Sequence, residues 1–84
     1  MQVTLKLYAT LTDYLPPDSR AENLVRLDVD DGATIAAVVA PFNLPPRLTH
    51  LVLVNGVFVP PGERGTHALR EGDVVAIWPP IAGG

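Results

Sequence analysis

The first third of the chain contains two segments in which apolar and polar residues alternate. From residue 2 to residue 8 every second position is apolar, and this period of two is typical of a half-buried strand. Residues 24–30 alternate in the same way and predict a second strand, antiparallel to the first. The stretch between them, residues 9–23, is predicted to be a loop with a helical turn at residues 11–15.

A short helix is predicted after the turn formed by Asp30, Asp31 and Gly32. Thr34 has a side chain suited to a helix N-cap. Behind it, apolar residues at i, i+3, i+4 and i+7 form one helix face: Ile35, Val38, Val39 and Phe42. Pro41 lacks an amide donor and disfavours helical geometry in the residue before it, so the helix must be short.

The second half of the chain predicts a hairpin and a final strand. Residues 51–54 form an unbroken apolar run, which suggests a central strand. Asn55-Gly56 is a strong hairpin turn signal, and residues 57–59 form the return strand. Residues 74–78 are the last strand, which Pro79-Pro80 ends. The order predicts an α+β fold in which one short helix packs on one face of a mixed sheet of four to five strands.

Composition and charge narrow the classes of function. The chain has 84 residues, enough for one domain, and no cysteine, so it has neither a disulfide nor a thiolate ligand. Its net charge is −3 and Lys6 is its only lysine, which argues against nucleic acid or an anionic membrane as a partner. It has no apolar run of membrane-spanning length and no secretory signal at its start. We therefore expect a cytoplasmic domain.

Few side chains offer chemistry of their own. His50 and His67 are the only histidines, Ser19 is the only serine, and their spacing does not suggest a catalytic triad. The acidic residues around Gly32 are interpreted as a solvated turn that suits the start of the helix. Two histidines without a cysteine make a metal site improbable, and we expect no metal and no bound cofactor.

The end of the chain carries the most specific pattern. Gly72-Asp73 precedes the last strand, Pro79-Pro80 follows it, and the chain closes on Gly83-Gly84. This pattern resembles the MoaD/ThiS family of small ubiquitin-like sulfur carriers, most of all the small subunit of molybdopterin synthase. Further segments extend the resemblance over the whole chain: residues 7–11, 32–35 and 53–56. The first strand lacks the Asn-Gly turn of thiamine-pathway members, which favours the molybdopterin branch; Val74 and Trp78 depart from residues common in the family.

The resemblance implies a ubiquitin-like β-grasp fold with parallel first and last strands, a domain over residues 1–78, and a reactive tail over residues 79–84. It implies that an E1-like adenylating enzyme uses ATP to activate the carboxylate of Gly84, and that a sulfur donor then leaves a thiocarboxylate. The large subunit of molybdopterin synthase would use that sulfur, so this chain would be a non-catalytic subunit. Three alternatives stay open: a carrier for thiazole or tungsten-cofactor synthesis, a modifier joined through Gly84 to a lysine, and a β-grasp interaction domain with an inert tail.

The tail residues have physical reasons in this scheme. Gly83 and Gly84 lack Cβ and fit a narrow tunnel, while Pro79 and Pro80 favour an extended path away from the sheet. Ile81 and Ala82 complete the tail.

A partner-binding face is predicted from the phase of the last strand. Val75 and Ile77 would face the helix, which leaves the other phase of the sheet open to a partner. The residues predicted to bind partners there are Tyr8, Phe58, Val74, Ala76 and Trp78. The charged residues Arg64, Arg70 and Glu71 either set the register of docking or are ordinary solvated turn residues.

Overall fold

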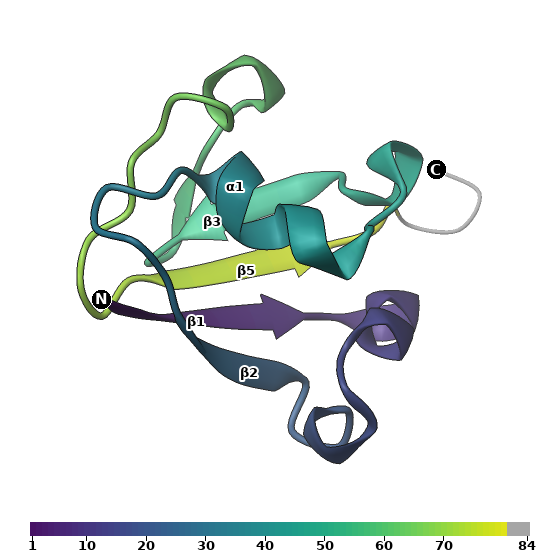
Figure 1. Cartoon of the computed structure of the whole chain (residues 1–84). Helices are drawn as coiled ribbons and strands as arrows, with labels where there is room; N and C mark the ends of the chain where they lie inside the picture. The colour runs from purple at the N-terminus through teal and green to yellow at the C-terminus, as the bar shows by residue number, and fades with distance from the viewer. Residues whose placement is uncertain (81–84) are drawn as a thin grey trace.

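The fold is one mixed sheet with a short α-helix packed on one face (Figure 1). The structure is a computed structural model that describes residues 1–80. The sheet order is β2-β1-β5-β3-β4, with β1 and β5 parallel and the other pairs antiparallel. This confirms the predicted β-grasp arrangement, with the first and last strands side by side in the centre. The strands are β1 (Gln2–Leu7), β2 (Leu24–Asp28), β3 (Leu51–Val54), β4 (Val57–Phe58) and β5 (Val74–Trp78).

The helix is as short as the proline predicts. α1 spans Ile35–Val39, and the Oγ1 atom of Thr34 accepts a hydrogen bond from the amide of Ala37 at 3.2 Å, as an N-cap does. The chain continues as the 3-10 helix η3 (Ala40–Phe42), which contains Pro41. In Figure 1, α1 and η3 lie over the β3–β5 side of the sheet, and β2 lies beyond them.

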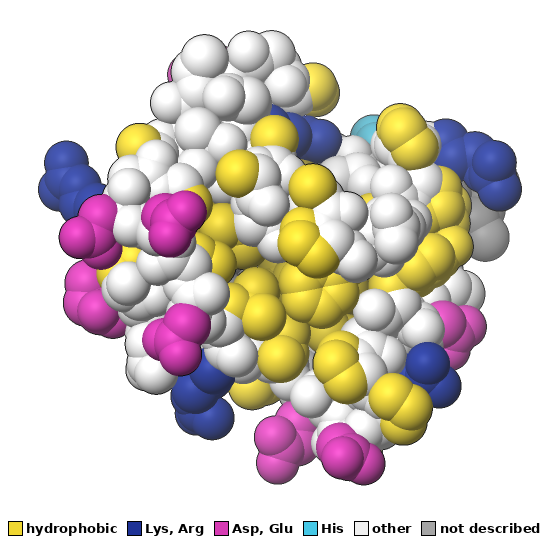
Figure 2. Space-filling view, viewed as in Figure 1, with side chains coloured by type: hydrophobic (Ala, Val, Ile, Leu, Met, Phe, Trp, Pro, Cys, Tyr) yellow, Lys and Arg dark blue, Asp and Glu magenta, His cyan; other side chains and the backbone are white. Residues whose placement is uncertain are grey.

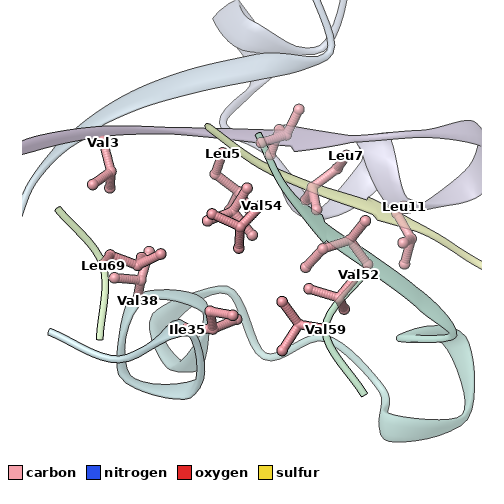
Figure 3. Close-up of a cluster of buried hydrophobic side chains, with 13 residues drawn as sticks. Val3, Leu5, Leu7, Leu11, Ile35, Val38, Val52, Val54, Val59 and Leu69 are labelled. Carbon is pink, nitrogen blue, oxygen red and sulfur yellow. The ribbon is translucent and has the colours of Figure 1, made fainter. Parts of the chain in front are cut away.

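The core lies between the helical layer and one face of the sheet. Val3, Leu5 and Leu7 of β1 point toward Ile35 and Val38 of α1 (Figure 3). Leu11 and the inward residues of β3 and β5 join them and are buried, whereas Val25 and Leu27 of β2 pack against this core but stay partly exposed. In β1, β3 and β5 the core residues alternate with side chains that lie on the second face of the sheet, which α1 leaves uncovered within residues 1–80.

Some boundaries differ from those predicted by the sequence. β2 ends at Asp28 instead of residue 30, because β1 begins at Gln2 and leaves only Met1 opposite Val29. β4 stops at Phe58, two residues before Pro60, which has no amide hydrogen to donate. The loop of residues 9–23 contains two 3-10 helices. Including these, the further 3-10 helices are η1 (Ala9–Tyr14), η2 (Pro17–Ser19), η4 (Pro46–Leu48) and η5 (Pro61–Glu63).

None of the helices in the described part of the chain, residues 1–80, combines the length and the apolar character needed to cross a membrane.

Candidate functional site

The last strand is held on both sides up to its final residue. The amide of Tyr8 donates to the carbonyl of Ile77 at 3.1 Å, and the amide of His50 donates to the carbonyl of Trp78 at 3.2 Å. The chain leaves the sheet directly afterwards, through the half-buried Pro79 and Pro80. The segment that follows the strand therefore starts from a fixed point. The predicted tail residues Ile81, Ala82, Gly83 and Gly84 lie outside the described residues.

Two aromatic rings pack together at this point. The rings of Tyr8 and Trp78 are stacked, with centroids 4.0 Å apart and planes inclined by 4°. Tyr8 follows β1 in the parallel register that pairs Leu7 with Ile77. Ala9 then takes a φ of 53°, a left-handed backbone that turns the chain into η1. Tyr8 is thus the last residue before this turn that lies beside β5.

The predicted partner-binding residues share the uncovered face of the sheet. Val75 and Ile77 are fully buried against the core, as predicted, so Val74 and Trp78 point the other way and are half-buried. Phe58 is paired with Leu53, which lies between the buried residues Val52 and Val54 and so faces away from the core. Phe58 is 51% exposed. The apolar residues of this uncovered face are Tyr8, Leu24, Leu51, Leu53, Phe58, Val74, Ala76 and Trp78.

Ala76 departs from the expectation of an open position. Its phase is right, but it is only 8% exposed. Ala76 lies between Lys6 and Leu53 on the neighbouring strands, and these longer side chains flank its single methyl group. A partner on this face would therefore contact the flanking side chains first.

The Gly72-Asp73 pair positions the start of the last strand. Gly72 has a φ of 83°, which favours glycine, and its amide donates to the carbonyl of Gln2 at 2.7 Å. The Asp73 carboxylate accepts hydrogen bonds from the Arg70 amide at 2.9 Å and from Asn55 Nδ2 at 2.8 Å. Asn55 Oδ1 in turn accepts from the Val74 amide at 2.9 Å. The two turns are thereby joined, which fixes β5 against the hairpin.

The sequence reasoning missed this link and the role of Arg64. The Arg64 guanidinium donates to three backbone carbonyls: Val59 at 3.3 Å, Thr49 at 2.9 Å and His50 at 3.0 Å. Arg64 is therefore part of the fold rather than a free rim charge, and burial lowers its pKa from the ordinary value. No motif in the sequence marks this role, because Thr49 and His50 are distant from Arg64 along the chain.

The other two predicted rim charges differ from each other. Both carboxylate oxygens of Glu71 accept from the amide of Gln2, at 3.2 and 3.1 Å. Arg70 is exposed and borders a groove of about 530 Å³ beside the hairpin. Glu63, His67 and Asp73 also line this groove. Within residues 1–80, no three His, Asp or Glu side chains gather in a way that could hold a metal ion.

Comparisons with known proteins agree with this geometry. The model of the ThiS family matches residues 16–84. SAMP1 of Haloferax volcanii, small archaeal modifier protein 1, is 28% identical with a TM-score of 0.69, and all of both chains is covered. A second Haloferax volcanii protein, solved in solution, is 30% identical with a TM-score of 0.73, over 100% of this chain and 87% of that one.

A third similar structure is a complex of subunits 1 and 2 of molybdopterin-converting factor from Helicobacter pylori. It is 17% identical, with a TM-score of 0.62 over the whole of both chains, so it supports the fold alone. Curated proteins give no significant match.

Proposed function

The chain belongs to the ThiS family, and from this premise we propose that it is a sulfur carrier whose Gly84 becomes a thiocarboxylate. The family comprises ubiquitin-like sulfur carriers and modifiers, and this chain has their β-grasp fold. The observation that carries the proposal is the anchored end of β5. Hydrogen bonds from the amides of Tyr8 and His50 hold β5 in the sheet as far as Trp78. Gly83 and Gly84 are the fifth and sixth residues after Trp78. Residues 79–84 could reach roughly 20 Å from that anchor.

The proposed chemistry needs a partner enzyme. A terminal carboxylate has a pKa of about 3.3–3.7, so it is anionic at neutral pH and a poor electrophile. An E1-like adenylating enzyme would join the Gly84 carboxylate to the α-phosphate of ATP and release pyrophosphate. Hydrosulfide, or a sulfur donor equivalent to it, would then attack the carbonyl carbon and release AMP, leaving the thiocarboxylate. This chain supplies the acyl group and the docking surface, and the partner supplies the nucleotide site.

The destination of the sulfur is the second part of the proposal. We assign the sulfur to molybdopterin synthesis in the cytoplasm, with the large subunit of molybdopterin synthase as the partner that uses it. The Helicobacter pylori structure, in which a protein of this fold is bound to subunit 2 of molybdopterin-converting factor, supports a partner of this kind. The open sheet face with Trp78 at its end offers the apolar surface that such a complex would bury.

A second function is favoured by a specific observation. The chain is similar over its whole length to small archaeal modifier protein 1, at 28% identity. A modifier would use the same adenylated Gly84, but the amine of a lysine on a target protein would displace AMP and form an isopeptide bond. The two functions share every step up to the adenylate and differ only in the nucleophile.

Intact-mass spectrometry separates these functions. The chain is incubated with an E1-like adenylating enzyme, Mg-ATP and sulfide, with or without a lysine-bearing target protein. Exchange of one carboxylate oxygen for sulfur at Gly84 supports the carrier, and an isopeptide adduct supports the modifier. A matched variant with one alanine appended after Gly84 should give neither product and keep its melting temperature. An unchanged mass with a panel of bacterial and archaeal activating enzymes would overturn both functions.

A further inference from the structure

Within the described part of the chain, the outer edge of β2 is an unpaired strand edge with three free backbone positions. The β1–β2 ladder runs from Leu7, whose amide donates to Asn23, to Val29, whose amide donates to Met1. Hydrogen-bonded and non-hydrogen-bonded pairs alternate in an antiparallel ladder. The amides and carbonyls of Leu24, Arg26 and Asp28 therefore point away from β1. Within residues 1–80, no loop hydrogen bond uses them.

The opposite edge of the sheet is much less open. β4 has only two residues, and the bond from the Val59 amide to the Val52 carbonyl places Phe58 as its single outward position. Pro60 follows immediately and has no amide hydrogen. Short strands and prolines are common ways in which proteins protect sheet edges. β2 has neither protection, so it is the edge at which an added strand would find several partners.

Apolar side chains accompany the free edge on the helix side of the sheet. Val25 and Leu27 pack against the core but stay partly exposed, because the five-residue α1 covers the β3–β5 side (Figure 1). Figure 2, seen from the helix side, shows apolar side chains gathered in the middle of this face with acidic and basic side chains around them. A strand added beside β2 would place every second side chain next to Val25 and Leu27.

The net charge around this edge is negative. Residues 13–31 contain six acidic residues, all exposed, and two arginines, a formal charge of −4. The rest of the chain has four basic and three acidic residues, a charge of +1, so the acidic charge is concentrated beside β2. Arg20 is engaged with the carbonyls of Leu15 and Asp13, and the Met1 ammonium lies 3.5 Å from Asp31.

From these observations we propose that the β2 edge binds an extended segment of a partner protein in which apolar residues alternate with Lys or Arg. The backbone of the segment pairs with Leu24, Arg26 and Asp28, as in other cases of strand addition. Its apolar side chains lie beside Val25 and Leu27, and its basic side chains meet the acidic rim. A second copy of this chain is a poorer occupant, because it would bring a second segment of charge −4 to the first. The proposal does not depend on Gly84.

A symmetric peptide tests the edge without choosing a strand direction. The probe is the blocked nonapeptide Lys-Val-Lys-Val-Thr-Val-Lys-Val-Lys, which sets threonine opposite Arg26. Amide hydrogen exchange of the full chain is measured by NMR with and without millimolar peptide. We expect the outward amides of Leu24, Arg26 and Asp28 to gain at least roughly tenfold protection. The charge-inverted peptide, with Glu for Lys, should give none.

Two proline variants make the test specific. Arg26→Pro removes an outward amide that does not serve the β1–β2 ladder, and it also removes a positive charge, so charge alone would strengthen binding. We expect at least roughly tenfold weaker peptide binding. Phe58→Pro removes the matching amide on the other edge and should leave binding unchanged.

Three results would overturn the proposal. The first is no protection at saturating peptide, and the second is equal binding by Arg26→Pro in a variant whose remaining spectrum is native. The third is protection of the same three amides by dimerisation without peptide, which would assign the edge to a second copy. Chemical-shift changes spread over the acidic residues, without protection of the three amides, would also overturn the proposal.

Discussion

Tyr8 and Trp78 stack across two parallel strands, with their ring planes 4° apart and their centroids at 4.0 Å. The two residues are 70 positions apart in the chain, so the stack closes a long-range contact at the end of β5. We expect it to stabilise the fold beyond the burial of each ring, by about 0.5–1.5 kcal/mol. A double-mutant cycle of Tyr8→Ala and Trp78→Ala, followed by circular dichroism in urea, measures this coupling.

The control for this cycle pairs Trp78→Ala with Tyr14→Ala. Tyr14 lies in η1 and is 36% exposed, and its ring is not stacked on another among residues 1–80. The free energies of unfolding should add for this control pair to within about 0.5 kcal/mol. A coupling between Tyr8 and Trp78 no larger than that would contradict the prediction.

Phe58 should matter for docking and little for stability. It is 51% exposed on the uncovered face, so Phe58→Ser should lower the free energy of unfolding by less than about 1 kcal/mol. If the face seats an E1-like adenylating enzyme, losing this ring should weaken binding roughly tenfold, since exposed aromatics often dominate interfaces. The fluorescence of Trp78, the only tryptophan, reports the titration.

Val57 provides the matched control for Phe58. It is the neighbouring residue of the same strand, is 68% exposed, and pairs with the buried Val54, so its side chain points to the other face. Val57→Ser should leave the affinity for the enzyme unchanged. Equal effects of the two substitutions would show that the uncovered face is not the docking surface.

The link between Asn55 and Asp73 should contribute to stability through hydrogen bonds. Asn55→Gly keeps the positive φ of 51° accessible and removes the bonds to Asp73 and to the Val74 amide. We expect the free energy of unfolding to fall by about 1–2 kcal/mol. Asn43→Gly is the control, because Asn43 has a similar φ of 55° and, among residues 1–80, a single side-chain hydrogen bond, which is a long one of 3.5 Å to the carbonyl of Pro41. Equal losses in the two variants would trace the effect to the glycine rather than to the lost bonds.

Arg64 should not be replaceable by lysine. Its planar guanidinium reaches carbonyls of Val59, Thr49 and His50 at once, and a single ammonium cannot reproduce that fork. Arg64→Lys should lower the free energy of unfolding by about 1.5–3 kcal/mol in urea denaturation. The exposed Arg47, with no side-chain hydrogen bond among residues 1–80, is the control, and Arg47→Lys should be neutral. A neutral Arg64→Lys would show that the three bonds contribute nothing net.

The sequence predicts the sheet well because local residue patterns determine its strands and turns. The Asn55-Gly56 turn, the Thr34 cap and the proline in the helix each fix a local backbone choice, and each is confirmed. The central pairing of the first and last strands is not local and came from the family resemblance. The structure places it in register, with Leu5 opposite Val75.

Contacts that join distant segments could not be predicted from the sequence. Arg64 resembled a solvated charge, since nothing nearby in sequence shows that Thr49 and His50 offer it carbonyls. Ala76 was expected to be open from strand phase alone, whereas its burial depends on the lengths of Lys6 and Leu53 on the neighbouring strands. Phase predicts which face a residue lies on, but the size of its neighbours decides how exposed it is.

The prolines after Trp78 should matter for the proposed reaction and not for the fold. Pro79 and Pro80 restrict the backbone where the chain leaves its anchor, so less conformational entropy is lost when the tail enters a partner's active site. Replacing both with glycine should add about 1–2 kcal/mol to the cost of ordering, which is roughly a five- to thirtyfold loss in kcat/KM for adenylation. ATP–pyrophosphate exchange catalysed by an E1-like enzyme measures this. The kcat/KM of the double alanine variant should lie between those of the unchanged chain and of the double glycine variant. The melting temperature should change little in either variant. Unchanged kinetics in the double glycine variant would show that the tail gains nothing from being stiff.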